Sequence, residues 1–201
     1  MSTHDRERWN EKYKNVEAQS LAQPDEWLVE AMRVIETTPD GAASKRVLDV
    51  ACGLGHNAIW LAGQGWQIDG VDISKSGLEH ARQSAEVKGV DVHWIEADLD
   101  TWNPARHEYD VVVVFRFLDR DTVPRVVQTA LRPTGWLVYE TFSAAQCQRS
   151  DNHIKNTNFT LAEGEFQTLF PQFDVVAHRE DVLTDRTVER FLCRRRTSEQ
   201  M

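Results

Sequence analysis

The sequence predicts an α/β domain built on a mainly parallel sheet. Short runs of apolar, β-branched residues alternate with segments of helical period along most of the chain. This alternation is typical of strands that are joined by crossover helices and therefore lie parallel. Near the C-terminus, only the short segment 180–187 separates two apolar runs. Because that segment is too short for a helical crossover, the last two strands are expected to be antiparallel.

Two helices are expected before the first strand. Residues 6–14 form a short amphipathic pattern that carries Trp9 and Tyr13. Residues 25–37 place apolar side chains at the spacing of one packed helix face, and Pro39 then begins a turn. Trp9 and Tyr13 are expected either to pack against the edge of the sheet or to form a flap over a bound ligand.

Five strands are expected in the central part of the chain, at residues 46–51, 66–73, 90–97, 109–117 and 136–142. The helices between them are expected at residues 56–65, from 76 to about 89, and from 121 or 122 to 131. Ser76 and Glu79 have the spacing of a capping box, and Pro133 ends the last of these helices. Thr134 and Gly135 are expected to turn the chain into the fifth strand.

The C-terminal part begins with a long polar segment, residues 143–158, that shows no period. A loop of this length in a compact domain indicates a lid or binding loop. Thr160 and Glu163 have the spacing of a second capping box, and Pro171 ends the helix that would follow. The final strands are expected at residues 174–179 and 188–194.

Composition excludes several classes of protein. The chain has 201 residues, 41% of them hydrophobic, which suits one globular domain. Its formal net charge of −9 argues against DNA as a partner and disfavours RNA, because an acidic surface repels phosphates. The three cysteines form no CxxC pair, so we expect a reducing, cytoplasmic setting and no metal site. We expect neither a secretory signal nor a membrane anchor, because no apolar run approaches the ~20 residues of a membrane helix.

The segment around residues 49–55 predicts a nucleotide site. Gly53 and Gly55 follow a buried strand and precede a helix. Because glycine has no side chain, a ligand can approach the backbone there and meet the helix N-terminus. Asp72 ends the second strand, where a doubly wound, Rossmann-like sheet places a carboxylate against ribose hydroxyls. Asp49 lies inside the first strand, where it would repel a pyrophosphate and attract an ammonium group. These residues favour S-adenosylmethionine as the cofactor, and a small NAD-dependent reductase is the alternative.

The sequence also resembles the class I S-adenosylmethionine-dependent methyltransferases. The matching motifs lie at residues 47–57, 71–74, 96–99, 109–112 and 131–135. Segments 9–13, 52–57 and 139–142 resemble the tellurite-resistance-type branch, whose members act on small molecules or small oxyanions. The resemblance implies a seven-stranded sheet, mostly parallel with an antiparallel last strand. It also implies one methyltransferase domain over residues 1–201, divided into N-terminal helices and flap (1–44), cofactor-binding core (45–142), candidate substrate loop (143–160), and C-terminal helix and strands (161–201).

The resemblance further implies a cofactor site with ten members: Asp49, Ala51, Gly53, Gly55, Asn57, Asp72, Ile73, Asp98, Leu99 and Phe115. In this set, Asp49 and the glycine loop would hold the methionine end and Asp72 the ribose. Asp98 would accept from the adenine amino group. The chain departs from the family at Ala51 and at Thr134, where the family often has glycine.

Candidates for the acceptor site lie at the ends of neighbouring strands. Arg116 either binds an anionic acceptor or pairs with Asp119 or Asp121. Glu140 either takes a proton from the acceptor or pairs with Arg116. The substrate candidates are Trp9, Tyr13, Arg116 and Arg120, and the candidates for a catalytic role are Arg116 and Glu140.

We therefore expect methyl transfer from S-adenosylmethionine to a small-molecule or small oxyanion acceptor, by a monomer or homodimer. The alternatives are a non-catalytic protein that binds the same cofactor, an RNA methyltransferase, and the NAD-dependent reductase.

Overall fold

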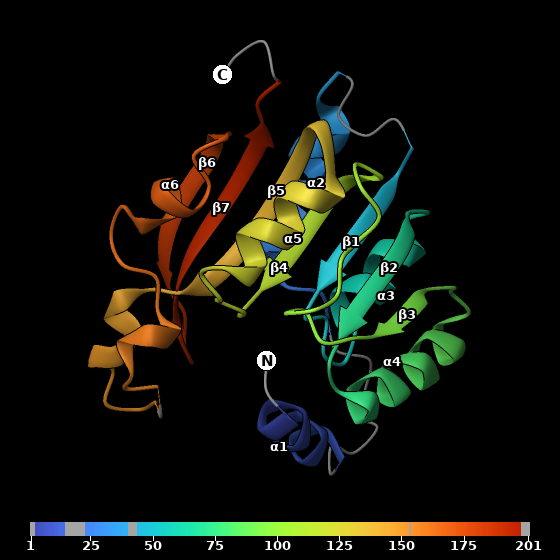
Figure 1. The fold of residues 1–201 in the computed structure, drawn as a ribbon, viewed down its shortest axis with the longest axis horizontal. Coiled ribbons are helices and arrows are strands. Elements are labelled where there is room, and N and C mark those ends of the chain that lie inside the picture. Colours follow the sequence, from blue (N-terminus) through green and yellow to red (C-terminus); the bar gives the residue numbers. More distant parts are fainter. Residues whose placement is uncertain (1–2, 15–22, 40–43, 153, 198–201) are drawn as a thin grey trace.

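A computed structural model describes residues 3–14, 23–39, 44–152 and 154–197 of the chain (Figure 1). Its centre is a seven-stranded sheet of order β3-β2-β1-β4-β5-β7-β6. The strands are β1 (Arg46–Val50), β2 (Gln67–Asp72), β3 (His93–Glu96), β4 (Tyr109–Phe115), β5 (Leu131–Phe142), β6 (Phe173–Val182) and β7 (Thr187–Arg195). The first five strands pair in parallel, whereas β7 is antiparallel to both β5 and β6. The predicted fold class is thus confirmed.

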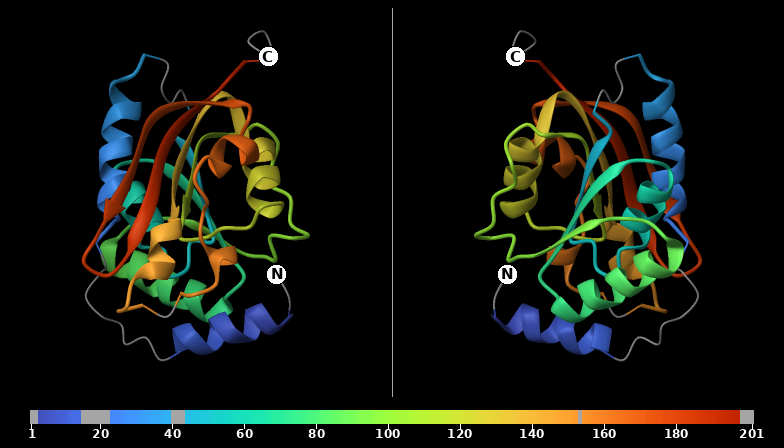
Figure 2. Two further views of the ribbon diagram at one scale, coloured as in Figure 1. Left: turned by 90° about the vertical axis from the view of Figure 1, so that its left-hand side faces the viewer. Right: turned by 90° about the vertical axis from the view of Figure 1, so that its right-hand side faces the viewer.

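Helices cover both faces of this sheet (Figure 2). One face carries α2 (Glu26–Thr37) and α3 (His56–Gly63), and the other carries α5 (Thr122–Ala130) and α6 (Glu165–Leu169). The remaining helices, α1 (Thr3–Lys14) and α4 (Lys75–Lys88), pack on each other. Figure 1 shows α1 at the edge where β1 and β2 end, so the N-terminal helix lies at the carboxyl edge of the parallel strands.

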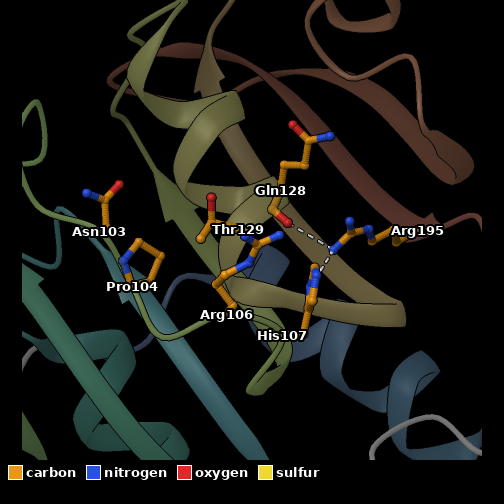
Figure 3. A pocket seen from close by; sticks show the side chains of 7 residues that line it. All are labelled: Asn103, Pro104, Arg106, His107, Gln128, Thr129 and Arg195. Carbon is orange, nitrogen blue, oxygen red and sulfur yellow. Dashed lines mark hydrogen bonds between the residues drawn. The ribbon is translucent and has the colours of Figure 1, made fainter.

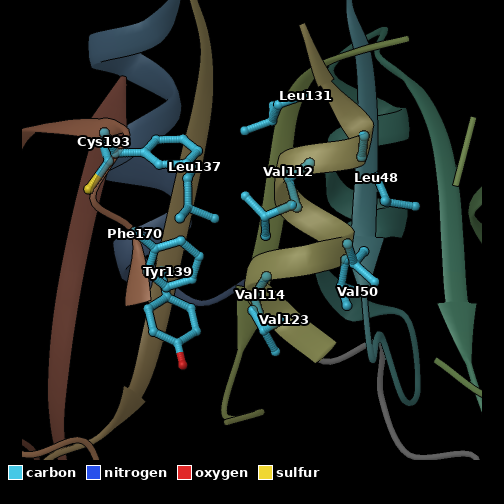
Figure 4. Close-up of a cluster of buried hydrophobic side chains, with 14 of the residues drawn as sticks. Leu48, Val50, Val112, Val114, Val123, Leu131, Leu137, Tyr139, Phe170 and Cys193 are labelled. Atoms are coloured by element: carbon cyan, nitrogen blue, oxygen red, sulfur yellow. The ribbon is translucent and has the colours of Figure 1, made fainter. Parts of the chain in front are cut away.

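The core follows from strand alternation, since successive side chains point to opposite faces. Leu48, Val112 and Tyr139 pack with α5 and α6 (Figure 4), and their neighbours Val47 and Val111 pack with α2 and α3. Every residue of β4 is buried. The central strands therefore read as continuous apolar runs, as expected for a parallel sheet that is covered on both faces.

Two predicted helix starts are wrong. Ser74, rather than Ser76, caps α4, because its side chain accepts a hydrogen bond from the Gly77 amide. α6 begins after Gly164, which has a left-handed backbone, and not at the predicted Thr160. In both places the capping-box spacing occurs in the sequence, but the chain reaches helical geometry at a different residue.

The predicted turn before β5 is also wrong, because β5 already begins at Leu131. Thr134 has a φ of 63°, and the pairing with β4 is irregular between Tyr109 and Val111. The chain therefore passes through this segment as a bulge within a continuous strand, which inserts extra residues without ending the pairing.

The C-terminal segment is more ordered than its polar composition predicts. The candidate loop contains two short 3-10 helices, Ala144–Gln148 and Thr157–Phe159. β6 and β7 extend through most of the expected connection, and a tight turn closes them with a hydrogen bond from the Leu183 amide to the Arg186 carbonyl. This hairpin brings residues near its turn to the carboxyl edge of β5.

Candidate active site

The glycine loop between β1 and α3 has a left-handed backbone at three positions. φ is 55° at Ala51, 56° at Gly53 and 72° at Gly55. A Cβ atom at Gly55 would lie 2.4 Å from the ring of Trp94, so this position requires glycine for space as well as for conformation. The loop thus turns sharply at the end of β1 and leads directly into α3.

Asp72 ties this loop to the start of α4. One of its carboxylate oxygens accepts from the Gly53 amide at 2.8 Å, and the other accepts from the Ser74 amide at 2.8 Å. Burial raises the pKa of Asp72, and these two amides oppose that rise. The carboxylate is therefore held at the end of β2, beside the glycine loop, as the sequence predicts.

Asp49 is the most unusual carboxyl group of the site. It is 2% exposed, and its Oδ2 atom has no hydrogen-bond partner among the described residues. Burial, with further contributions from the charges of Asp25 and Asp72, raises the pKa of Asp49 to about 8. A buried carboxyl group with an open oxygen is suited to a cationic partner, because a cation would compensate the cost of its ionisation.

Helix α1 covers the glycine loop. The Asn10 side chain accepts from the Ser74 hydroxyl at 2.9 Å and from the Ser76 amide at 3.1 Å. The hydroxyl of Tyr13 lies 2.8 Å from the position that a Cβ of Gly53 would take. Trp9 stacks on Tyr13 with ring centroids 5.6 Å apart. Both aromatic residues therefore belong to a layer that lies over the loop.

The other predicted cofactor residues occupy different environments. Asp98 begins the turn after β3, and its carboxylate accepts from the Asp100 amide at 3.0 Å. Ile73, Leu99 and Phe115 are buried at strand ends. The Asn57 side chain points away from the loop toward α2, where it donates to the Asp25 carboxylate at 3.0 Å and accepts from the Asp25 amide at 2.9 Å.

Arg116 forms the centre of a buried charged cluster at the end of β4. Its guanidinium group binds both oxygens of Asp25, at 2.6 and 3.0 Å, and one oxygen of Glu140 at 3.3 Å. Its φ is 55°, and its amide donates to the Glu140 carbonyl at 2.7 Å. The pairing with Glu140 is the one we anticipated, whereas Asp119 and Asp121 are not its partners.

Asp25 was not recognised from the sequence as a site residue. It precedes α2 and accepts hydrogen bonds from Arg116 and from the imidazole of His56, the latter at 2.9 Å. Burial opposes its ionisation, but the hydrogen bonds from His56 and Arg116 outweigh burial and hold its pKa below the ordinary value. In the sequence, Asp25 is only the first residue of the helical pattern 25–37.

Two arginines of the C-terminal hairpin complete the cluster, and no local pattern indicated them. Arg190, which is 4% exposed, donates to Glu140 at 2.8 Å and to Asp181 at 2.5 Å. Arg186 lies 3.5 Å from the Asp25 carboxylate. The carboxyl ends of β4 and β5 and the beginning of β7 are therefore crossed by ion pairs between distant segments.

Arg120 does not belong to this cluster. It binds both oxygens of Glu165, at 2.5 and 3.1 Å, and the carbonyl oxygens of Asn158 and Thr160. Its guanidinium group thereby connects the segment before α5 to the end of the polar segment. The two arginines among the substrate candidates, Arg116 and Arg120, thus bind different carboxylates.

Comparison with known proteins identifies the family. Residues 47–135 match the family described as "Methyltransferase domain". The chain is similar to the probable S-adenosyl-L-methionine-dependent methyltransferase TehB of Haemophilus influenzae, with 24% identity over 140 residues, 68% of this chain and 49% of TehB. Residues 47–135 thus belong to this methyltransferase domain family, and the chain is similar to S-adenosylmethionine-dependent methyltransferases. Its similarity to TehB agrees with the branch that the sequence motifs indicated.

Other relatives of this chain differ in their named roles. The ubiquinone biosynthesis O-methyltransferase of Vibrio cholerae is 34% identical over 109 residues, 52% of this chain and 44% of that protein. The ribosomal RNA small subunit methyltransferase C of Alcanivorax borkumensis is 35% identical over 104 residues, 46% of this chain and 31% of that protein. The chain thus spans half or less of the length of these curated relatives.

Solved structures show the same fold. The magnesium protoporphyrin IX methyltransferase of Synechocystis superposes with a TM-score of 0.71 at 17% identity, over 96% of this chain and 99% of that one. TehB of Haemophilus influenzae superposes with a TM-score of 0.65 at 17% identity, over 95% of this chain and 67% of TehB. Among the described helices, none is both long and apolar enough to cross a membrane.

Proposed function

We propose that the protein transfers the methyl group of S-adenosylmethionine to a small molecule or small oxyanion at the carboxyl edge of the sheet. The observation that carries this proposal is the buried, open carboxyl oxygen of Asp49 beside the glycine loop, within a methyltransferase-family domain. A pyrophosphate-bearing nucleotide would place negative charge against Asp49, which argues against the NAD-dependent reductase.

The proposed cofactor site follows the strand ends. Asp49 would hold the ammonium group at the glycine loop, and Asp72 the ribose hydroxyls. Asp98 would accept from the adenine amino group beside Leu99, with Phe115 toward the methyl group. When bound, S-adenosylmethionine supplies a methyl group on a positively charged sulfur. Because the Asn57 side chain binds Asp25, we assign Asn57 to positioning Asp25 rather than to direct contact.

The protein contributes to catalysis mainly by aligning the cofactor with the acceptor, since displacement at a methyl group needs no covalent intermediate with the protein. Holding two reactants in position can contribute on the order of 7–11 kcal/mol. Arg116 is suited to dock a polar or anionic acceptor, because Asp25 and Glu140 fix its guanidinium group. Glu140 is bound by guanidinium groups from Arg116 and Arg190, so we assign it to positioning Arg116 rather than to proton transfer.

We assign recognition of the acceptor to residues other than those that hold the cofactor. The family match covers residues 47–135, and the relatives above carry different names, so similarity there does not select an acceptor. We assign recognition to α1, to the Arg116 cluster and to the substrate loop 143–160. The net charge of −9 favours a small acceptor over an RNA polyanion. A cytoplasmic monomer or homodimer remains part of the proposal.

The first test is calorimetric titration with S-adenosylmethionine and with its demethylated product. We expect micromolar binding to the native chain and a loss of at least tenfold in Asp72→Asn. The matched control Glu86→Gln, on the exposed side of α4, should bind as the native chain does. Absence of binding by the native chain would refute the cofactor assignment.

The second test separates catalysis from binding alone. The chain would be incubated with S-adenosylmethionine and a panel of small thiols, phenols, amines and oxyanions, and the demethylated product would be quantified. Turnover with one of these classes supports the proposal. Cofactor binding without turnover of any small acceptor, together with turnover of RNA, would instead support the RNA methyltransferase.

A further inference from the structure

A basic cavity lies at the edge of the sheet opposite the proposed active site. It has a volume of about 540 Å³ and is formed by the segment before β4, the end of α5 and the end of β7 (Figure 3). β4 separates the two sites: the cavity precedes Tyr109, whereas Arg116 follows Phe115. At ~3.3 Å per residue, the strand places them about 20 Å apart.

The described lining of this cavity contains two arginines and a histidine, and it contains no carboxylate. Arg106 is exposed and has no hydrogen-bond or ion-pair partner in the described parts of the chain. The neighbouring acids bind elsewhere, since Glu108 pairs with Arg46 and Asp174 pairs with Arg196. The cavity is therefore locally positive in a protein whose net charge is −9.

Arg195 is only partly satisfied by its contacts. Its Nη1 atom donates to the carbonyl oxygens of Gln128 and Leu131 and lies 3.2 Å from a ring nitrogen of His107 (Figure 3). Its Nε and Nη2 atoms make no hydrogen bond or ion pair with the described residues, so one edge of the guanidinium fork is open. Burial lowers the pKa of Arg195, and no carboxylate offsets that effect. An anion in the cavity would offset it.

His107 is fixed in an unusual backbone conformation beside Arg195. Its φ is 54°, and its amide donates to the Thr129 carbonyl at 2.9 Å. Its Nδ1 lies 2.7 Å from the Leu131 carbonyl, which accepts the hydrogen of that nitrogen. A non-glycine residue in this region is strained, and such strain is concentrated at ligand sites.

We propose that this cavity binds a small phosphate ester. Arginine forks match the geometry of phosphate oxygens, and two arginines suit a phosphate dianion better than a single carboxylate. The volume falls within the range of about 300–1,000 Å³ found for small-molecule sites, so the cavity has room for an organic group as well as the phosphate.

The test compares ligands by calorimetry in phosphate-free buffer at constant ionic strength. The probes are uridine monophosphate, inorganic phosphate and uridine, none of which contains an adenine that could enter the proposed cofactor site. We expect uridine monophosphate to bind at about 1 mM or below, inorganic phosphate to bind more weakly, and uridine not to bind.

Arg106→Gln is the decisive variant, because Arg106 has no described partner whose loss would disturb the fold. We expect it to weaken binding of uridine monophosphate at least tenfold and to leave cofactor binding unchanged. Arg82→Gln, an equal change of charge on the exposed face of α4, should bind as the native chain does. Arg195→Gln should also lose binding, but it removes contacts to the end of α5 and is therefore secondary.

Three outcomes would overturn this proposal: no binding of uridine monophosphate to the native chain, equal binding by the native chain and Arg106→Gln, or equal binding of uridine and its phosphate. Binding of an RNA oligonucleotide that is lost in Arg106→Gln, without binding of the mononucleotide, would assign the cavity to a polymer instead. All of these results are independent of whether the protein transfers methyl groups.

Discussion

Cofactor binding should release a proton from Asp49 near neutral pH. The pKa of this carboxyl group is about 8, so about nine in ten molecules carry the proton at pH 7. A bound ammonium group favours the ionised form, and the proton must then leave. Because the amino group of the free cofactor titrates near 7.7–8.0, it takes up only about 0.1–0.2 proton at pH 7. The expected net release is about 0.8 proton for each cofactor bound.

The Asp49 carboxyl group and the amino group of the cofactor also determine how the affinity for the cofactor depends on pH. Between pH 6 and pH 7, the ionised fraction of Asp49 rises about tenfold while the amino group stays mostly charged, so affinity should rise about eightfold. It should reach a maximum near pH 8 and then fall, because the amino group loses its charge. In Asp49→Asn the affinity should be lower and almost constant from pH 6 to pH 7.

Calorimetry at pH 7 in buffers of different ionisation enthalpy measures this proton directly. The slope of observed enthalpy against buffer enthalpy gives the number of protons released. A slope near zero for the native chain would refute the reasoning. So would an unchanged proton release in Asp49→Asn, because the proton would then come from another group.

Three further predictions concern stability. The Asp49→Asn variant should have a larger free energy of unfolding than the native chain, and the difference should grow between pH 4 and pH 8 and reach ~4 kcal/mol at pH 7. The reason is that Asp49 keeps its proton in the folded chain at a pH where the unfolded chain has lost it. A difference, measured by urea denaturation, that does not change with pH would contradict this. Thr134→Gly should raise the Tm by about 2–4 °C, since relief of left-handed strain of ~1–2 kcal/mol outweighs the flexibility of glycine, and a lower Tm would count against it. Gly55→Ala should lower the Tm and abolish cofactor binding because its Cβ would meet the Trp94 ring, whereas the control Gly63→Ala, which has open space, should remain folded and bind.

The sequence was sufficient for the sheet because its central strands are determined by local composition. β4 is apolar at nearly every position and completely buried, and Asp72 ends a strand next to a glycine loop. In a parallel sheet these strand ends meet at one edge, so the spacing along the chain was enough to place Asp49, Gly53 and Asp72 together. Helix starts were less predictable, since Ser74 and Ser76 are equally suitable caps and only the path of the chain selects Ser74.

The proposed acceptor side could not be predicted in the same way, because its contacts join residues far apart in sequence. Asp25 and Arg116 are 91 positions apart, and Glu140 and Arg190 are 50 apart. Each residue alone has an ordinary explanation: a helix cap, a strand end or a charged strand face. Only the pairing of β5 with β7, and of the end of β4 with the start of α2, turns them into one buried cluster.

The backbone of Arg116 shows why this cluster matters for the site. Ala51 and Thr134, the two positions where the family often has glycine, both have positive φ, and so does Arg116. Arginine gains nothing from that conformation, so the cost must be met by the contacts it secures: a hydrogen bond from its amide to Glu140 and ion pairs to Asp25 and Glu140. These contacts come from α2 and β5, whereas the cofactor loop is held by β1, β2 and α4. Asp25 joins these two sets of elements, because it also binds His56 and Asn57 at the start of α3, directly after the glycine loop.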